Sequence, residues 1–349
     1  MAPASNPPRP GPANPAAVDP SRVPPDALPL SRWLSPLVRL MRSKAVRFGF
    51  LAVVLALLAV ALNEQAGTLG HQISRLSVPV VLLAFVFCLC GLFGSLMVWR
   101  EMLADLGSRL SIPEAVRIMF IGQLGKYVPG SIWPVLAQSE LGADRGVPRS
   151  RSAVSVLLSY AVMTCSGVVV AMVTLPFATA GSIGQYFWIL FLVPVAAVLL
   201  SPPVLNRLLR LVLRVSRRPV VQQNVSYRGL ARTMVWAVAT WLFNGLTVYA
   251  LMLQLAGHAQ GTLLVSIGAY SLSWAVGFLA VFAPAGAGVR EAVMVAVLSA
   301  RTTPATALTV ALLCRALAVV ADAAAGAVAS ALVGRRRLQR LRTGRGLTR

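Results

Sequence analysis

Residues 78–99 are VPVVLLAFVFCLCGLFGSLMVW, and their only ionisable groups are the thiols of Cys88 and Cys90. Residues 234–255 form a second apolar run that contains no charged side chain. Each run has about the twenty residues that a helix needs to cross the hydrocarbon of a bilayer. A β-barrel would instead show short runs of alternating polarity. The pattern therefore predicts an all-α, polytopic membrane helix bundle.

The composition of the whole chain agrees with this fold class. Of 349 residues, 57% are hydrophobic and 12% are charged, whereas a soluble domain has about twice that charged fraction. The formal net charge of +22 comes from Arg and Lys that cluster beside the apolar runs, as expected for cytoplasmic loops. This placement argues against nucleic acid as a partner. We expect the basic clusters to contact anionic lipid head groups instead.

Two assignments of the membrane spans fit the charge distribution. Six full spans are predicted near 45–63, 78–99, 152–175, 184–201, 233–255 and 305–333. Two further apolar segments, 111–137 and 263–300, are each interrupted by a Pro- and Gly-containing break. The basic clusters of 207–232 and 335–349 all become cytoplasmic if the first broken segment re-enters from the cytoplasm and the second from outside. In the other assignment, 263–283 and 285–300 both cross, which gives eight spans.

The re-entrant assignment contains a candidate inverted repeat. The segments 45–175 and 184–333 each run as two spans, a broken segment and a further span. Because three spans separate their starts, the two halves would have opposite orientations. Inverted repeats with paired broken helices are typical of transporters that bind their substrate near the middle of the membrane. Two ordinary helix kinks are the alternative interpretation.

The ends of the chain differ from the membrane part. Residues 1–30 are rich in Pro, Ala, Ser and Asn, and are predicted to form a disordered cytoplasmic tail. Residues 31–334 are predicted to form one polytopic domain, followed by a basic cytoplasmic tail at 335–349. We expect a multi-pass protein of the bacterial inner membrane with both termini in the cytoplasm. The sequence does not predict the oligomeric state.

The first break offers a candidate anion site. It contains Lys126 and Tyr127, followed by Pro129, Gly130 and Ser131. Pro and Gly stop the helix, and the start of the next helix presents unpaired N–H groups that favour an anion. Together with the charge of Lys126, these groups would suit the phosphate of a lipid. The alternative is that Lys126 extends to the cytoplasmic surface beside a simple turn.

Charged residues follow the first break and surround the second. Glu140 could pair with Lys126 or with Arg145. At the second break, Gly286 and Gly288 permit close backbone approach, and Arg290 and Glu291 lie in an otherwise apolar stretch. Ionisable groups in such a place are costly and mark functional sites, although a purely structural salt bridge is a comparable interpretation.

The last span adds two charged residues on one helical face. Arg315 and Asp322 are seven residues apart, so both are predicted to point into the bundle. The sequence allows pairs of Arg315 with Glu291, and of Asp322 with Arg290 or Lys126. The polar residues Asn244, Tyr270 and Ser271 are weaker candidates, since such side chains usually connect helices.

The two breaks also resemble those of a known family. The residues from Gly125 to Gly130 and those from Pro284 to Glu291 are similar to motifs of the lysylphosphatidylglycerol synthase transmembrane-region family, also called flippase-like membrane proteins. The resemblance extends over about 40–334. It implies movement of a lipid or lipid-linked molecule between leaflets. Members with a synthase domain also aminoacylate a phospholipid, but no such domain follows residue 334 in this sequence.

We therefore expect a flippase-like transporter of an anionic phospholipid or a polyprenyl-phosphate-linked molecule. Its expected binding residues are Lys126, Tyr127, Gly130, Ser131, Gly286, Gly288 and Arg290, with Glu140, Glu291, Arg315 and Asp322 as charge pairs or a gate. The alternatives are a membrane scaffold for a lipid or cell-wall enzyme, and an integral-membrane transferase that uses Glu140 or Glu291. No catalytic constellation, metal site or cofactor is predicted.

Overall fold

The helices begin and end where the local sequence favours a change in backbone conformation. A computed structural model describes residues 70, 74–123, 133–178, 198, 200–215, 224–257, 262–280, 283 and 286–344, and every element in these ranges is a helix. Helix α4 (Val78–Asp105) has Pro79 in its first turn, where the missing N–H costs nothing. Helix α11 (Tyr227–Ala256) starts at Ser226, whose hydroxyl accepts from the Gly229 N–H at 3.0 Å. It ends at Gly257, which has a positive φ of 81°.

Five helices are long and apolar enough to cross a membrane. They are α4, α7 (Arg149–Thr174), α11, α12 (Thr262–Leu279) and the Pro304–Ala331 part of α14 (Pro304–Gly344). Four of them match predicted spans, and α12 falls in the second broken segment. The predicted span 45–63 lies outside the described residues, and of the predicted span 184–201 only residues 198, 200 and 201 are described. The polytopic helical membrane fold is thus confirmed.

The second broken segment consists of one long and one short helix. Helix α12 is followed by non-helical Ala280 and Ala283 and then by α13 (Val289–Leu298). With ten residues, α13 is about 15 Å long, half the thickness of the hydrocarbon. Its length therefore favours a re-entrant hairpin over a second full crossing. The inverted repeat itself stays a prediction.

Helices α4 and α11 pack closely because small residues of α4 face polar residues of α11. A Cβ atom on Gly91 would collide with Asn244, and one on Gly94 would collide with Thr240. At the end of this pair, the Asp105 carboxylate accepts from the Ser226 N–H at 2.7 Å and from its hydroxyl at 2.6 Å. Close approach through small residues and interhelical polar contacts is the usual basis of helix packing in membranes.

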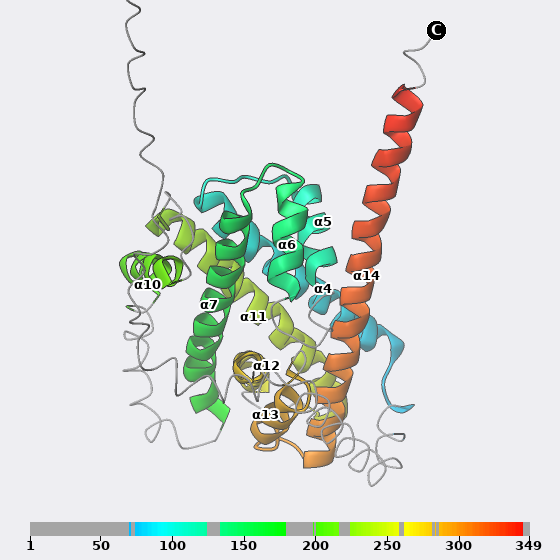
Figure 1. Cartoon of the computed structure of the whole chain (residues 1–349). Coiled ribbons are helices and arrows are strands. Elements are labelled where there is room, and N and C mark those ends of the chain that lie inside the picture. Colours follow the sequence, from blue (N-terminus) through cyan, green and yellow to red (C-terminus); the bar gives the residue numbers. More distant parts are fainter. Residues whose placement is uncertain are drawn as a thin grey trace, which may run out of the picture. The chain divides into compact units, whose positions relative to one another are not determined.

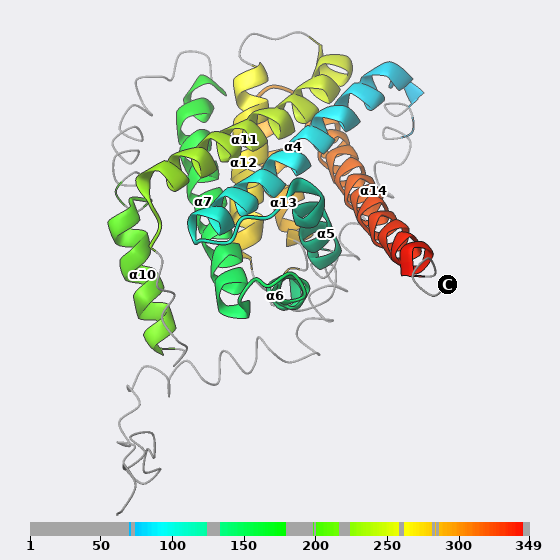
Figure 2. The same cartoon turned by 90° about the horizontal axis from the view of Figure 1, so that it is seen from above.

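The remaining helices lie around this central pair (Figures 1 and 2). Helices α5 (Ile112–Gln123) and α6 (Trp133–Ala143) contact each other at one end of the bundle, while α12 and α13 lie toward the opposite end (Figure 1). A short 3-10 helix, η2 (Leu175–Ala178), follows α7, and α10 (Pro202–Val215) precedes α11. Helix α14 continues to Gly344, so most of the predicted tail 335–349 extends the helix, because Arg and Leu are good helix formers.

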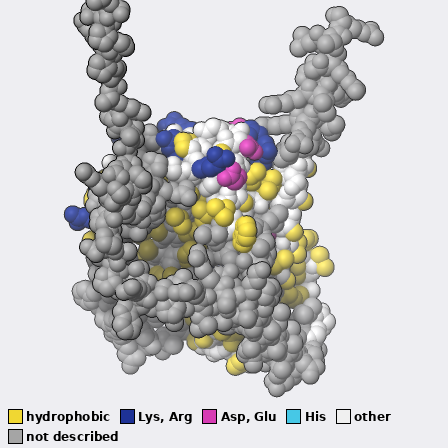
Figure 3. All heavy atoms as spheres, viewed as in Figure 1, with side chains coloured by type: hydrophobic (Ala, Val, Ile, Leu, Met, Phe, Trp, Pro, Cys, Tyr) yellow, Lys and Arg dark blue, Asp and Glu magenta, His cyan; other side chains and the backbone are white. Residues whose placement is uncertain are grey.

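Charged and apolar side chains occupy different parts of the visible surface. Among the described residues in Figure 3, Arg, Asp and Glu gather at the end where α5 and α6 lie, and hydrophobic side chains cover the region beneath. Many large apolar side chains on the long helices are exposed, for example Leu82 (57%) and Val235 (68%). Such exposure is expected where lipid, not water, surrounds the helix.

Candidate functional site

The described helices line one large cavity, whose mainly apolar wall carries several polar and charged side chains. Its volume is about 230 Å³, enough for several water molecules or for a polar head group. Eight helices contribute to its wall: α4, α5, α6, α7, α11, α12, α13 and α14. A smaller cavity of about 40 Å³ adjoins it between α12, α13 and α14, since both are lined by Tyr270, Trp274, Arg290 and Arg315.

Both broken segments turn toward this cavity. From the first, Gln123 at the end of α5 and Pro134 at the start of α6 line the wall. From the second, Phe278 near the end of α12 and Arg290 in the first turn of α13 line it. The two hairpins therefore approach one cavity from opposite ends of the bundle (Figure 1). Helix ends at such a place offer unpaired backbone groups to a ligand.

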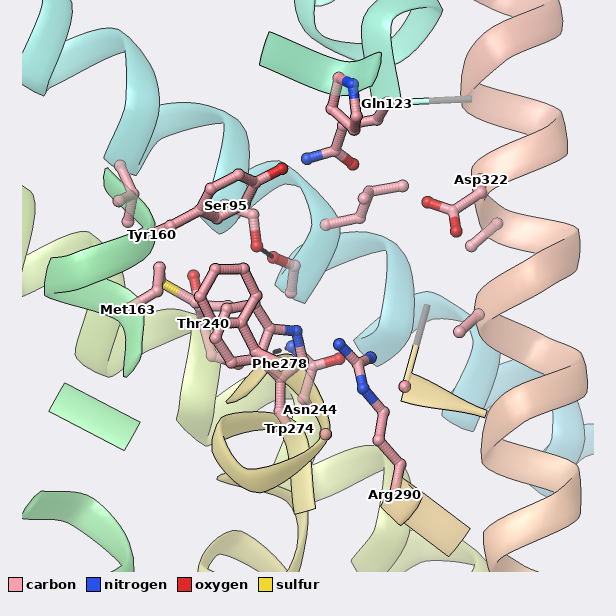
Figure 4. Close-up of a pocket in the computed structure, with 18 of the residues that line it drawn as sticks. Ser95, Gln123, Tyr160, Met163, Thr240, Asn244, Trp274, Phe278, Arg290 and Asp322 are labelled. Carbon is pink, nitrogen blue, oxygen red and sulfur yellow. Dashed lines mark hydrogen bonds between the residues drawn. The ribbon is translucent and has the colours of Figure 1, made fainter. Parts of the chain in front are cut away.

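Arg290 extends into the cavity through a slot formed by glycines (Figure 4). A Cβ atom on Gly277 would collide with the Arg290 Cγ, and one on Gly286 would lie 2.9 Å from its Nε. The guanidinium carbon is 5.4 Å from the centroid of the Trp274 ring, which is within cation–π distance. The Arg290 Nε is buried without a hydrogen-bond partner. Because the Nε lies inside the slot, a ligand in the cavity would contact the outer nitrogens of the guanidinium (Figure 4), whose positive charge favours an anion.

The neighbouring residue, Glu291, caps the N-terminus of α13. Its Oε2 accepts from the Gly288 N–H at 2.6 Å, and Gly288 has the positive φ of 81° that glycine tolerates. Its Oε1 lies 3.8 Å from the Arg315 Nε. Glu291 thus caps α13 and pairs with Arg315, one of the combinations that the sequence allowed. Asp322, 9% exposed, lines the larger cavity on the same helix as Arg315.

Aromatic rings form a continuous part of the cavity wall. Trp274 stacks on Phe278 with centroids 5.3 Å apart and planes at 3°. Trp241 meets Trp274 edge to face at 5.3 Å, and Tyr160 contacts Phe278 at 5.0 Å. These rings come from α7, α11 and α12. They fix the orientation of Trp274, and through it that of Arg290, because aromatic pairs favour such geometries.

The predicted site residues fall into three groups: those at the cavity, one on the exposed surface, and those outside the described residues. Gly286, Arg290, Arg315 and Asp322 line the cavity, whereas Gly288 and Glu291 form the adjacent helix cap. Glu140 does not pair with Arg145 as proposed: it binds Arg149 at 2.8 and 2.9 Å on the exposed surface. Arg145 instead binds Glu114 at 2.8 Å. The remaining predicted residues, Lys126, Tyr127, Gly130 and Ser131, lie outside the described residues.

The correction at Glu140 has a simple physical cause. Arg149 begins α7, one short turn beyond the end of α6, so its guanidinium reaches the carboxylate of Glu140 with two parallel hydrogen bonds. These hydrogen bonds from Arg149 lower the pKa of Glu140. Both side chains are 64% exposed, which removes Glu140 from the cavity.

Several wall residues were not predicted from the sequence. They include the ring of Trp274 and the polar groups of Ser95, Gln123, Gln138 and Tyr160. A polar side chain within an apolar run was the available signal, since such groups are enriched at helix interfaces and pathways. Trp274 and Tyr160 gave no comparable signal, because aromatic residues are common on any face of a membrane helix.

These features define a class: an integral, multi-pass helical membrane protein with a charged internal cavity between two broken segments. A family model, the lysylphosphatidylglycerol synthase TM region, matches residues 46–326, and the chain belongs to this family. The match includes every described helix residue that lines the cavity. No curated protein matches the chain at a significant level. The family suggests a role in lipid modification or lipid transport.

Proposed function

We propose that the protein is a flippase-like carrier of an anionic lipid, either a phospholipid or a polyprenyl-phosphate-linked molecule. The observation that supports this proposal most directly is the convergence of both broken segments on one cavity that contains Arg290. The head group would enter the cavity, and its phosphate would meet the guanidinium of Arg290 that lines the wall. The lipid chains would stay in the surrounding bilayer, since the cavity volume is only about 230 Å³.

A carrier needs no catalytic residues, and the proposal assigns none. Arg315 and Glu291, 3.8 Å apart, would form a charge pair that holds α13 against α14 and that opens or closes during transport. Asp322 would complete the polar path. By the positive-inside rule, the end with α5, α6 and the basic end of α14 would face the cytoplasm of the bacterial inner membrane. Basic clusters at this end would contact anionic lipids.

Transport by the full chain in liposomes tests the proposal. Phosphatidylglycerol with a fluorescent acyl chain would be distributed over both leaflets, and a membrane-impermeant reductant would bleach the outer leaflet. The carrier should expose the inner pool to bleaching at a rate that falls at least about tenfold in Arg290→Gln, the loss expected for one charged hydrogen bond. Arg290→Lys should retain part of the rate.

Arg228→Gln is the matched control, because Arg228 is exposed at the start of α11 and does not line the cavity. The proposal would be wrong if the wild-type chain moved no more lipid than empty liposomes, or if Arg290→Gln matched the control. Chemical turnover of a lipid in detergent, without separated leaflets, would favour a transferase.

A further inference from the structure

Asp322 places a carboxylate on the wall of the larger cavity. Among the described residues that line this cavity, it is the only acidic side chain. It belongs to α14, is 9% exposed, and points into the cavity, as Arg290 of α13 does (Figure 4). Arg315, which lies about two turns earlier on the same helix, also lines the cavity. A carboxylate within a membrane helix is costly, which marks Asp322 as a functional candidate.

The other titratable groups around the two cavities keep one protonation state near neutral pH. They are Cys88 on α4, Tyr160 on α7, Tyr270 on α12, Arg290 and Glu291 on α13, and Cys314 and Arg315 on α14. Arginine stays charged, tyrosine stays neutral, and buried thiols are inert. Glu291 is ionised because it accepts from the Gly288 N–H at 2.6 Å and lies 3.8 Å from the Arg315 Nε. Asp322 is therefore the group whose protonation can change when a ligand binds.

An anionic head group in the cavity would upset the balance of charge. The described walls of the two cavities carry two arginines and two carboxylates, so a phosphate adds one negative charge in excess. The larger cavity is only about 230 Å³, which keeps a phosphate on Arg290 close to Asp322. Two like charges about 8 Å apart, at an effective dielectric constant of about 20, repel enough to weaken binding roughly thirtyfold. One proton on Asp322 removes this repulsion and restores the balance.

We infer that the protein is a proton-coupled carrier, in which Asp322 binds one proton together with each lipid anion. The inference rests on the proposed function and adds the energy source of the transport. The proton comes from water on the side where the anion enters, neutralises the Asp322 carboxylate while the phosphate contacts Arg290, and leaves to water on the other side. Anion and proton strengthen the binding of each other reciprocally. Because they move together, no net charge crosses the membrane.

A pH gradient across liposomes tests this coupling. The full chain is reconstituted with phosphatidylglycerol that has a fluorescent acyl chain, and valinomycin with equal potassium on both sides holds the membrane potential at zero. The lipid should move from the leaflet on the acidic side to the leaflet on the alkaline side, because the proton moves down its gradient. With one proton per anion, a gradient of about one pH unit gives a leaflet ratio of about ten at equilibrium. Empty liposomes give the passive background.

Binding to the purified full chain gives a second measurement that needs no variant. Tryptophan fluorescence reports on Trp241 and Trp274 in the wall, and a pH indicator in weakly buffered detergent records the protons taken up. We expect uptake of up to about one proton for each phosphatidylglycerol bound. Phosphatidylglycerol should bind up to about thirtyfold more tightly at about pH 5 than at about pH 8, because the protonated carboxyl group no longer repels the phosphate.

Asp322→Asn has the shape of the protonated residue but cannot release a proton. It should abolish the leaflet asymmetry and the proton uptake. It should also bind phosphatidylglycerol at about pH 8 as tightly as the wild type does at about pH 5, a result that a merely structural role of Asp322 does not produce. Asp144→Asn is the matched control, because Asp144 is exposed beyond α6 and does not line the cavity. This control should behave as the wild type in every measurement.

Each outcome separates the inference from the proposed function. Movement of lipid with a leaflet ratio that does not depend on the pH gradient would overturn the inference and leave lipid transport intact. An asymmetry that persists in Asp322→Asn would overturn it as well. If Asp322→Asn does not fold, the wild type decides: lipid binding without proton uptake would contradict the inference. Proton uptake on binding, without movement of lipid in liposomes, would overturn the proposed transport and retain Asp322 as a proton site.

Discussion

At the residue scale, the position of Arg290 depends on the lack of a side chain at Gly277. Gly277 is buried, and the Arg290 side chain occupies the space that a Cβ atom there would fill. Trp274 holds the guanidinium on the other side at 5.4 Å. Glycine at 277 is therefore explained by close approach of a side chain, as interior glycines in membrane helices often are. The positive charge of Arg290 is held in place before any ligand arrives, which reduces the entropy lost on binding.

Gly277→Ala should displace Arg290 from its slot. The added Cβ collides with the Arg290 Cγ and lies 3.0 Å from its Nε, so the side chain must move or the helices must separate. We expect weaker binding of phosphatidylglycerol by about tenfold, and a loss of folding stability of about 1–3 kcal/mol from overpacking. Tryptophan fluorescence and thermal unfolding measure the two effects.

Gly142→Ala is the control for this substitution. A Cβ atom at Gly142 would be 3.3 Å from the Ser152 hydroxyl oxygen, which is a close but tolerable contact at a site away from the cavity wall. If Gly277→Ala bound phosphatidylglycerol as tightly as Gly142→Ala does, the glycine slot would have no role in positioning Arg290.

At the element scale, the α5–α6 hairpin is held by ionic contacts at its outer end. Glu114 in the first turn of α5 accepts from the Ser111 hydroxyl at 2.7 Å, and Arg145, just after α6, binds it at 2.8 Å. The Ser111 hydroxyl and the Arg145 charge lower the pKa of Glu114 below its usual value of 4.5. A lowered pKa in the folded state means that the ionised carboxylate stabilises the fold.

This contact should make the stability of the hairpin depend on acid pH. The stabilisation by Glu114 is fully present above about pH 4.5, the ordinary value, and is lost as the pH falls through the lower pKa of the folded state. Glu114→Gln should lower the free energy of unfolding at pH 7 by about 0.5–1 kcal/mol, with a smaller difference from wild type at pH 3. Thermal unfolding in detergent at both pH values measures this.

Glu140→Gln provides the comparison for Glu114→Gln. Glu140 and its partner Arg149 are each 64% exposed. Such exposed ion pairs contribute little to folding stability because water screens them. We expect no measurable change in unfolding for this variant. Equal effects of the two substitutions at pH 7 would contradict the assignment of Glu114 as the anchor of the hairpin.

The sequence predicted where helices stop and restart better than which side chains pair with one another. Gly288 acts on its own backbone, so the restart of a helix at Val289 followed from local chemistry. The pairing of Arg315 with Glu291 was one of several combinations, because the choice depends on how α13 and α14 pack. Of the two partners that the sequence offered for Glu140, Arg145 was wrong for the same reason, because Arg145 binds Glu114 and Glu140 binds Arg149. The polar side chains on the cavity wall include residues of α4, α6, α7 and α11, and helical periodicity alone cannot say which polar faces meet.

At the scale of the whole molecule, two broken segments approach one cavity from opposite ends of the bundle (Figure 1). If the halves are inverted repeats, the outer ends of the two hairpins lie on opposite sides of the membrane. A carrier with this arrangement can expose its cavity to either leaflet by moving one half against the other. A scaffold does not require such an arrangement.

Single cysteines at the two outer ends test this arrangement in intact cells. Asp144 and Ala300 are both exposed, just beyond α6 and α13 respectively, and each would be replaced by cysteine in a chain whose native cysteines 88, 90, 165 and 314 are changed to alanine. A membrane-impermeant maleimide should label position 300 from outside and position 144 only after the membrane is opened. Transport of phosphatidylglycerol by each variant verifies that its fold is native. Labelling of both positions from the same side would contradict the inverted arrangement. It would remove the structural basis for alternating access and favour a scaffold, whose two hairpins need not face different compartments.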